Sequence, residues 1–108
     1  ARFGQFMLDG GNIHGRPAIA SAWLNGGLDQ QQALDEPGRG YGYLWWTDGD
    51  GSFAAIGIFG QMVYVDPVRH LVIAQVAAWP VATGKEQIAA RSAFVAAVKR
   101  AAEQPDAK

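Results

Sequence analysis

The sequence has no cysteine, no long apolar run and no concentration of charge of one sign. Without cysteine the chain can form neither a disulfide nor a thiolate metal site. No stretch approaches the roughly 18 apolar residues of a membrane span. The nine basic residues are scattered rather than gathered into the stripe that nucleic acid requires. We therefore expect no membrane span and no nucleic-acid partner.

What the chain does have is enough apolar material for one core. It is 108 residues long, 49% of them hydrophobic, with four tryptophans. A chain of this size forms at most one domain, so we predict that residues 1–108 are a single domain. The first residue is Ala1, and no segment resembles a targeting signal. This pattern suggests a processed product or a fragment, and it leaves the location open between bacterial cytoplasm and periplasm.

Three segments carry helix signals. Phe3, Phe6 and Met7 share one face of a helix over residues 2–8, which begins almost in mid-helix and hints at polypeptide upstream. A second helix is expected over residues 17–24 because Pro17 suits a first turn. Thr83 and Glu86 have the spacing of a capping box, which predicts a third helix that runs to about residue 103.

Four segments carry strand signals, over residues 41–47, 52–56, 61–65 and 71–78. The first two flank a strong turn signal at residues 48–51. The last is almost uniformly apolar, as expected for a central strand covered on both faces. Residues 25–38 predict a loop, with one helical turn near residues 30–34. The fold class is α+β, with an antiparallel sheet of about four strands and N-terminal and C-terminal helices packed on it.

The strongest chemical candidate is the pair of glycines at Gly57 and Gly60. A backbone amide beside glycine at a strand edge can point at a bound carbonyl and stabilise the oxyanion of acyl transfer. A side chain there would block the approach of substrate. Two glycines also occur in an ordinary bulge or tight hairpin, which the local pattern alone favours.

The aromatic strand offers a second candidate. Tyr41 and Trp45 could form a stacking wall for an apolar substrate. More often, aromatic residues at alternating strand positions are core on one face and cover on the other.

No nucleophile can be assembled from these residues. None of the three serines, Ser21, Ser52 and Ser92, precedes a lysine by three residues or lies in a Gly-x-Ser-x-Gly elbow. His14 and His70 fall beside turn residues, where a surface histidine is the plainer interpretation. The Asp48–Ser52 run fails the calcium-loop pattern, and residues 38–42 fail the dinucleotide pattern. We expect no metal and no cofactor.

The pieces follow one another in an order that resembles the C-terminal portion of the serine beta-lactamase and penicillin-binding-protein superfamily. The likeness is to the branch with class C beta-lactamases, esterases and 6-aminohexanoate-dimer hydrolases, and it implies a partial beta-lactamase-like fold. The segments that carry the likeness are residues 1–11, the Trp23 segment, residues 41–46, Phe59-Gly60-Gln61 and Val65-Asp66-Pro67.

The resemblance assigns roles to residues on the third family motif. That motif falls on Ala55-Ile56-Gly57, and the backbone amide of Ile58 becomes the second oxyanion donor next to Gly57. Ala55 replaces the basic residue of the motif, so a group that pairs with a substrate carboxylate is lost. An apolar, aromatic-lined site is implied, with the substrate-binding residues Ala55, Phe59, Gly60, Tyr41 and Trp45.

The resemblance implies the C-terminal fragment of a serine hydrolase that cleaves a small-molecule ester or amide through an acyl-enzyme. The family's Ser-x-x-Lys and tyrosine motifs are not in this chain, so we expect it to be inactive alone, and whether it is itself an enzyme stays open. The alternative is a non-enzymatic module for protein interaction or ligand binding. Exposed apolar surface would favour a homodimer of such a module. A third possibility is an unrelated α+β domain, which strands that are not neighbours in one sheet would favour.

Overall fold

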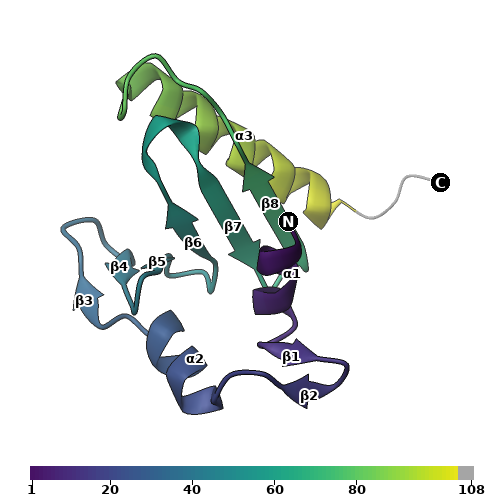
Figure 1. The fold of residues 1–108 in the computed structure, drawn as a ribbon. Helices are drawn as coiled ribbons and strands as arrows, with labels where there is room; N and C mark the ends of the chain where they lie inside the picture. Colours follow the sequence, from purple (N-terminus) through teal and green to yellow (C-terminus); the bar gives the residue numbers. More distant parts are fainter. Residues whose placement is uncertain (105–108) are drawn as a thin grey trace.

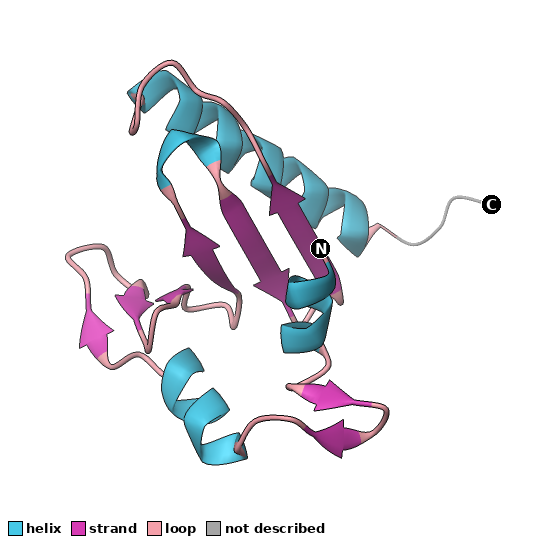
Figure 2. Ribbon diagram, viewed as in Figure 1, coloured by secondary structure: helices cyan, strands magenta, loops and turns pink. Residues whose placement is uncertain are grey.

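The computed structural model describes residues 1–104 as three helices on an antiparallel sheet (Figures 1 and 2). The helices are α1 (Arg2–Leu8), α2 (Ser21–Leu28) and α3 (Lys85–Glu103), with a short 3₁₀ helix η1 (Ile58–Gly60). A hairpin of β1 (Asn12–Ile13) and β2 (Arg16–Pro17) stands apart from the sheet. The sheet contains β3 (Gln32–Ala33), β4 (Gly40–Tyr41), β5 (Trp46–Thr47), β6 (Phe53–Ile56), β7 (Met62–Asp66) and β8 (Leu71–Gln75).

The spatial order of the six strands follows the chain, β3-β4-β5-β6-β7-β8, and every pair is antiparallel. The predicted α+β class is therefore confirmed, with six strands in place of about four. The strands that begin near residues 52, 61 and 71 are neighbours in one sheet. That removes the observation that would have favoured an unrelated domain.

The sheet separates two small cores. On one face, Phe53 and Val65 pack with Met7 of α1 and with Trp45. On the other face, Tyr64 and its neighbours Ala54, Met62 and Ile73 pack under α3. Figure 1 shows α3 lying along one face of β6–β8 and α1 on the opposite side. The alternation of side chains along each strand accounts for the two cores, because successive side chains point to opposite faces of the sheet.

Two predicted helix starts are wrong. The second helix begins at Ser21 rather than Pro17, because Pro17 pairs with Asn12 in the β1–β2 hairpin. The third begins at Lys85 with Gly84 as its N-cap, and no side chain caps it, so the capping box does not form. No helix within residues 1–104 is both long enough and apolar enough to cross a membrane.

The predicted strand over residues 41–47 is a tight hairpin. The amide of Gly42 donates to the carbonyl of Trp45 at 2.8 Å, and Leu44 turns the chain with φ 67°. A non-glycine residue in this left-handed region gives no clear signal in a sequence. The preceding loop also differs from expectation, since residues 32–33 form β3 rather than a helical turn.

The apolar segment over residues 71–78 is an edge strand rather than a central one. β8 ends at Gln75, has β7 as its single neighbour within residues 1–104, and leaves Val76 90% exposed. The run is apolar because α1 packs on one of its faces and α3 on the other. Whether the faces of a strand are covered does not depend on whether the strand lies at the edge of its sheet. An apolar pattern therefore does not indicate that a strand is central.

The turn between β7 and β8 is held by a fully buried carboxylate. Asp66 is 0% exposed, and its Oδ1 accepts hydrogen bonds from the amides of Val68 and Arg69 at 3.1 Å each. Its Oδ2 accepts one from Nη1 of Arg69 at 2.8 Å. The carboxylate therefore satisfies the backbone of the turn from inside.

We predict that Asp66→Ala lowers the free energy of unfolding by about 3 kcal/mol, because two turn amides and the Arg69 guanidinium lose the buried carboxylate that accepts from them. Urea unfolding followed by tryptophan fluorescence measures the change. Asp35→Ala, at an exposed position, is the matched control and is expected to cost less than about 0.5 kcal/mol. Equal losses for the two variants would contradict the assigned role of Asp66.

Candidate functional site

The loop from β6 to β7 carries the predicted oxyanion donor. Gly57 is extended, with φ −108° and ψ 173°, and its amide donates to the carbonyl of Gln61 at 2.9 Å. Ile58 then opens η1, and Phe59 turns the chain with φ 57°. A non-glycine residue in this conformation persists only where its surroundings hold it in place.

The segment after β8 supplies those surroundings. The amide of Phe59 donates to the carbonyl of Ala82 at 2.9 Å, and the carbonyl of Phe59 accepts from the amide of Trp79 at 3.2 Å. Both backbone groups of the turning residue are thus satisfied by residues far along the chain. The loop is held as a fixed turn rather than left as a free hairpin end.

Two glutamine side chains complete this support. Nε2 of Gln61 donates to the carbonyl of Ala77 at 2.6 Å, and Nε2 of Gln75 donates to the carbonyl of Gly60 at 2.8 Å. Neither glutamine was singled out from the sequence, because the bonds join residues 16 and 15 positions apart. The sequence pointed to Gln61 only as part of the Phe59-Gly60-Gln61 segment that carries the family resemblance.

Gly60 is required for both its conformation and its lack of a side chain. Its φ of 92° lies in the left-handed region, and a Cβ there would stand 2.7 Å from both Ala77 and the Trp79 ring. Gly60 is therefore needed for the turn between β6 and β7. The same turn also fixes the position of Ile58.

The amide of Ile58 is directed at the open side of β6. The amide of Asp48 donates to the carbonyl of Ser52, and Ala54 pairs with Trp46, so the backbone of Ala54 faces β5. Strand backbone alternates with period two, so the amide two positions beyond Ile56 faces the same side, past the end of β5. Within residues 1–104 no acceptor takes the Ile58 amide. Its side chain is 59% exposed.

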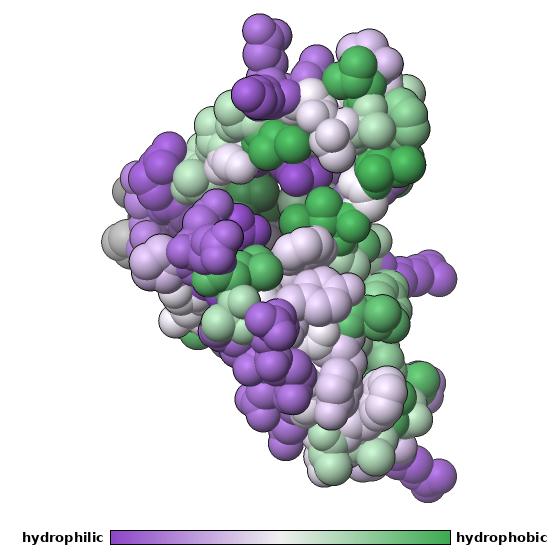
Figure 3. Space-filling model, turned by 90° about the vertical axis from the view of Figure 1, so that its left-hand side faces the viewer, coloured by the Kyte–Doolittle hydropathy of each residue, from purple (hydrophilic) through white to green (hydrophobic). Residues whose placement is uncertain are grey.

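Apolar side chains surround this amide. Ile56 is 38% exposed and Phe59 is 42% exposed. Figure 3 views the left side of Figure 1, where β5 and the β3–β4 hairpin lie, and shows a hollow bordered by both green apolar and purple hydrophilic side chains. The sequence from Phe53 to Val65 contains no charged residue. The loop therefore offers a hydrogen-bond donor in an apolar setting.

The other predicted site residues fall into two groups. Ala55 lies on β6 and packs against the core beneath α1, while Gly57, Phe59 and Gly60 adjoin Ile58 on the loop. Tyr41 packs edge-on against Trp46 at 4.9 Å between ring centres. Trp45 is only 8% exposed.

The structure does not bring the aromatic group to Ile58. The β4–β5 hairpin pairs with Phe53 and Ala54 at the start of β6, whereas η1 follows the end of that strand. Figure 1 shows the two at opposite ends of β6.

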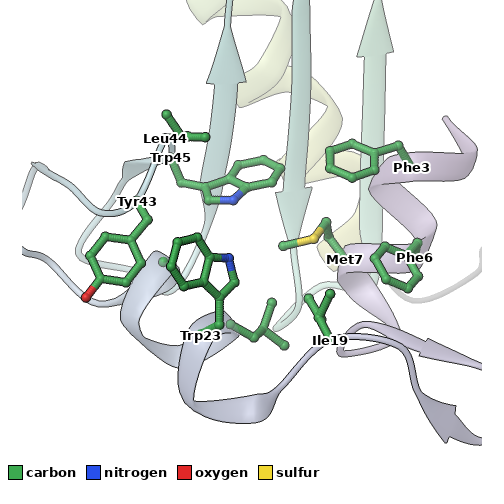
Figure 4. Close-up of a pocket in the computed structure, with 10 residues that line it drawn as sticks. Phe3, Phe6, Met7, Ile19, Trp23, Tyr43, Leu44 and Trp45 are labelled. Carbon is green, nitrogen blue, oxygen red and sulfur yellow. The ribbon is translucent and has the colours of Figure 1, made fainter.

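Trp45 instead lines an apolar groove of about 240 Å³ between α1, α2 and the β4–β5 turn (Figure 4). The rings of Trp23 and Tyr43 lie 5.0 Å apart, and those of Phe3 and Trp45 lie 5.9 Å apart. The remaining lining residues are Phe6, Met7, Ile19, Leu24, Gly27 and Leu44. The groove holds almost no polar atoms, so it provides packing surface rather than chemistry.

One cluster does bring a serine, a lysine and a tyrosine together, but it is buried. Ser52 is 1% exposed and its hydroxyl donates to Asp50 at 2.6 Å. Tyr64 is 4% exposed, burial raises its pKa, and the Lys99 ammonium lies 5.9 Å from its ring centre. Lys99 also pairs with Asp50. Because Ser52 and Tyr64 are buried and Lys99 is paired with Asp50, the cluster is a structural tie between α3 and the β5–β6 turn.

No nucleophile or metal set therefore forms among residues 1–104. Ser21 and Ser92 are exposed, lie on helices α2 and α3, and make no hydrogen bond to a lysine, histidine or tyrosine side chain in residues 1–104. No three histidine or acidic side chains in this part of the chain converge as ligands. The described chemistry of the site is the single Ile58 donor and its apolar border.

Comparison with known proteins places this geometry in a family. The chain is 33% identical over 91 residues to the 6-aminohexanoate-dimer hydrolase of Paenarthrobacter ureafaciens, across 74% of the chain and 23% of that protein. It superposes with a TM-score of 0.72 and 26% identity on a structure named as a 6-aminohexanoate-dimer hydrolase from Bacillus anthracis. The chain belongs to the beta-lactamase-like hydrolases. No family model matches it.

The comparisons confirm the resemblance seen in the sequence and the partial beta-lactamase-like fold. The superposition covers 94% of the chain and 28% of the Bacillus anthracis protein. The chain thus spans about a quarter of the length of each relative, and it corresponds to a C-terminal segment of the hydrolase fold. The segment includes the β6–η1–β7–β8 unit on which Ile58 lies.

We predict that Gly60→Ala lowers the unfolding free energy by about 3 kcal/mol, because the clash with Trp79 adds to the cost of left-handed backbone. Gly15→Ala is the matched control, since Gly15 also has a positive φ of 76° but nothing within 4 Å of a Cβ. It is expected to lose about 1 kcal/mol. Urea unfolding of both variants checks this, and equal losses would show that the contact with Trp79 is unimportant.

The environment of Asp50 predicts that the free energy of unfolding depends on pH. Burial alone would raise its pKa, but hydrogen bonds from Lys99 and Ser52 outweigh burial and hold the pKa well below its usual range. A depressed carboxyl pKa stabilises the fold above the ordinary pKa of about 4, and the stabilisation is lost as the pH falls below it. Unfolding free energy should fall more steeply with acid in the natural chain than in Asp50→Asn. Asp35→Asn should keep the natural slope, and parallel curves for the natural chain and Asp50→Asn would exclude the effect.

Proposed function

We propose that this chain supplies the oxyanion-binding edge of a serine hydrolase that cleaves small-molecule esters or amides through an acyl-enzyme. The observation that carries the proposal is the Ile58 amide, which faces the open side of β6 without an acceptor in the described residues. Both relatives are named as hydrolases of the 6-aminohexanoate dimer, which supports this reaction class.

In the proposed mechanism, a serine on another part of the hydrolase attacks the substrate carbonyl. The carbonyl oxygen becomes negatively charged and accepts a hydrogen bond from the Ile58 amide, while the serine's own amide supplies the second donor. The alcohol or amine then leaves with a proton, and water releases the acid from the serine. One preorganised donor of this kind contributes about 10²–10³-fold to the rate.

Preorganisation comes from the supports already described. The carbonyl of Gln61 holds Gly57, and Ala82 and Trp79 hold Phe59 on the other side of Ile58. The amide therefore needs no reorientation as charge develops on the substrate. A fixed donor costs no reorganisation energy at the moment of reaction.

The border of the loop favours a neutral, apolar substrate. Ala55 stands where the resemblance places a basic residue, and no charged residue occurs from Phe53 to Val65. A substrate carboxylate would find no cation on this stretch of the chain. The exposed side chains of Ile56, Ile58 and Phe59 suit an apolar acyl group.

The chain alone is expected to be inert, because none of its serines is placed for catalysis. Ser52 is buried, and the activated Ser-x-x-Lys serine of the family is not in the sequence. The chain then contributes a donor and a substrate border, while proton transfer belongs to the rest of the hydrolase.

A chimera tests the donor directly. The chain would replace the matching segment of the Bacillus anthracis relative, and ester hydrolysis would be measured for the chimera and its variants. Ile58→Pro removes the amide hydrogen together with the isoleucine side chain. Proline fits the backbone here, since it is tolerated at the first position of a helix and Gly57 before it is extended. We expect kcat/KM to fall about 10²–10³-fold.

Ile58→Ala is the matched control, because it removes the same side chain and keeps the amide hydrogen. It should retain activity within about tenfold of the parent chimera, and thermal melts confirm that both variants fold. A fluorophosphonate should label the chimera on its serine and leave the 108-residue chain unlabelled. Full activity in Ile58→Pro, or stoichiometric labelling of the chain alone, would overturn the proposal.

A further inference from the structure

Trp79 contacts the η1 loop through both its backbone and its ring. Its amide donates to the carbonyl of Phe59 at 3.2 Å. A Cβ on Gly60 would stand 2.7 Å from Nε1 and Cε2 of the Trp79 ring, so the glycine backbone packs directly against the indole. Figure 1 shows the segment between β8 and α3 passing beside η1. One residue therefore holds the two residues that follow Ile58.

The same ring also lies against α3. The guanidinium carbon of Arg91 lies over the Trp79 ring, 5.2 Å from its centre. This contact is a cation–π interaction, which strengthens when the cation is partly removed from water. Burial lowers the pKa of Arg91, as expected for a guanidinium that is partly shielded from water. Gln87, one helical turn before Arg91, lines the same hollow as Trp79. The ring is thus packed between the η1 loop and one face of α3.

The backbone after Ile58 requires such support. Phe59 and Gly60 have φ values of 57° and 92°, so two successive residues lie in the left-handed region. A non-glycine residue keeps this conformation only where its surroundings fix it. Trp79 acts on both residues, by a hydrogen bond at Phe59 and by ring contact at Gly60. Because Ile58 immediately precedes them, a shift of the ring would move the backbone that fixes its amide.

We propose that Trp79 is a positioning residue for the Ile58 donor and that Arg91 holds its ring in place from α3. The helix is thereby joined to the oxyanion-binding edge through one pair of stacked side chains. Trp79 acts through η1 and not through contact with the substrate. The inference rests on the proposed hydrolase function and names the residues that keep its donor preorganised.

The chimera described above tests the proposal. Trp79→Leu keeps the backbone amide and removes the ring. We expect kcat per site titrated with a fluorophosphonate to fall about tenfold while KM stays within about twofold, because a displaced donor weakens the transition state more than substrate binding. Affinity for an alkylboronic acid, whose tetrahedral adduct places an oxygen at the oxyanion position, should fall by about the same factor. Trp79→Phe keeps a ring and should retain most of the activity.

Arg91→Leu tests the α3 end of the stack. Leucine keeps the helix and removes the cation, so kcat and boronic-acid affinity should each fall about threefold. Arg91→Lys keeps a cation and should lose less. Arg100→Leu, at an exposed position in the last turn of α3, is the matched control and should leave both quantities unchanged. The Arg91 variants also keep the proposal testable if Trp79→Leu does not fold.

The donor itself separates this inference from the function on which it rests. In the Ile58→Pro background, Trp79→Leu should cause little further loss, because the two residues act through one hydrogen bond. Losses that multiply independently would show a general structural role and overturn the inference. So would unchanged kcat and boronic-acid affinity in both Trp79→Leu and Arg91→Leu. Either result leaves the proposed function standing if Ile58→Pro alone lowers activity, whereas full activity in Ile58→Pro would overturn the function and this inference together.

Discussion

The register of β6 on β7 is the constraint on which the rest of this structure depends. It pairs Ile56 with Met62, so Gly57 bonds to Gln61 and the next amide, that of Ile58, must face away from β7. A shift by one residue would turn that amide inward and place the side chains of β6 on the wrong cores. The same alternation passes through β7 to β8, where it decides which backbone groups face outward. One hydrogen-bond pattern therefore sets both the direction of the Ile58 amide and the backbone groups of β8 that β7 leaves unpaired.

The two ends of the sheet differ in the forces that hold them. At one end, the turns before β6 and after β7 are joined to the end of α3 by charges. Lys99 pairs with Asp50, and Arg69 reaches both Asp66 and Glu103. At the other end, η1 is held by backbone and amide hydrogen bonds from the segment after β8. A donor for an oxyanion is best placed where no nearby carboxylate competes for it. The paired carboxylates of Asp50 and Asp66 lie at the opposite end of β6, whereas the Arg91 guanidinium packs on the Trp79 ring beside η1.

The sequence predicted the parts of the fold that depend on alternation and on glycine. The strands over residues 52–56 and 61–65 match β6 and β7 closely, because each has one face on each core. The strand over residues 41–47 failed because Leu44 adopts a left-handed conformation that branched and aromatic neighbours do not signal. The support of the loop by Gln75 could not be foreseen, since it depends on where β8 ends in space. Likewise, β8 is apolar because two helices cover its faces, and this pattern gives no information on its position at the edge of the sheet.

Backbone groups without partners occur at both edges of the β6–β8 unit, yet they have different consequences. On β8 they lie on a regular strand, so another strand can satisfy all of them at once. At Ile58 the chain has already left the strand for η1, and Phe59 turns it away, so no strand can extend the pairing there. The only group that can satisfy this amide is an isolated acceptor brought to it. The left-handed turn at Phe59 therefore separates an edge that another strand can pair with from a single backbone donor that no strand can reach.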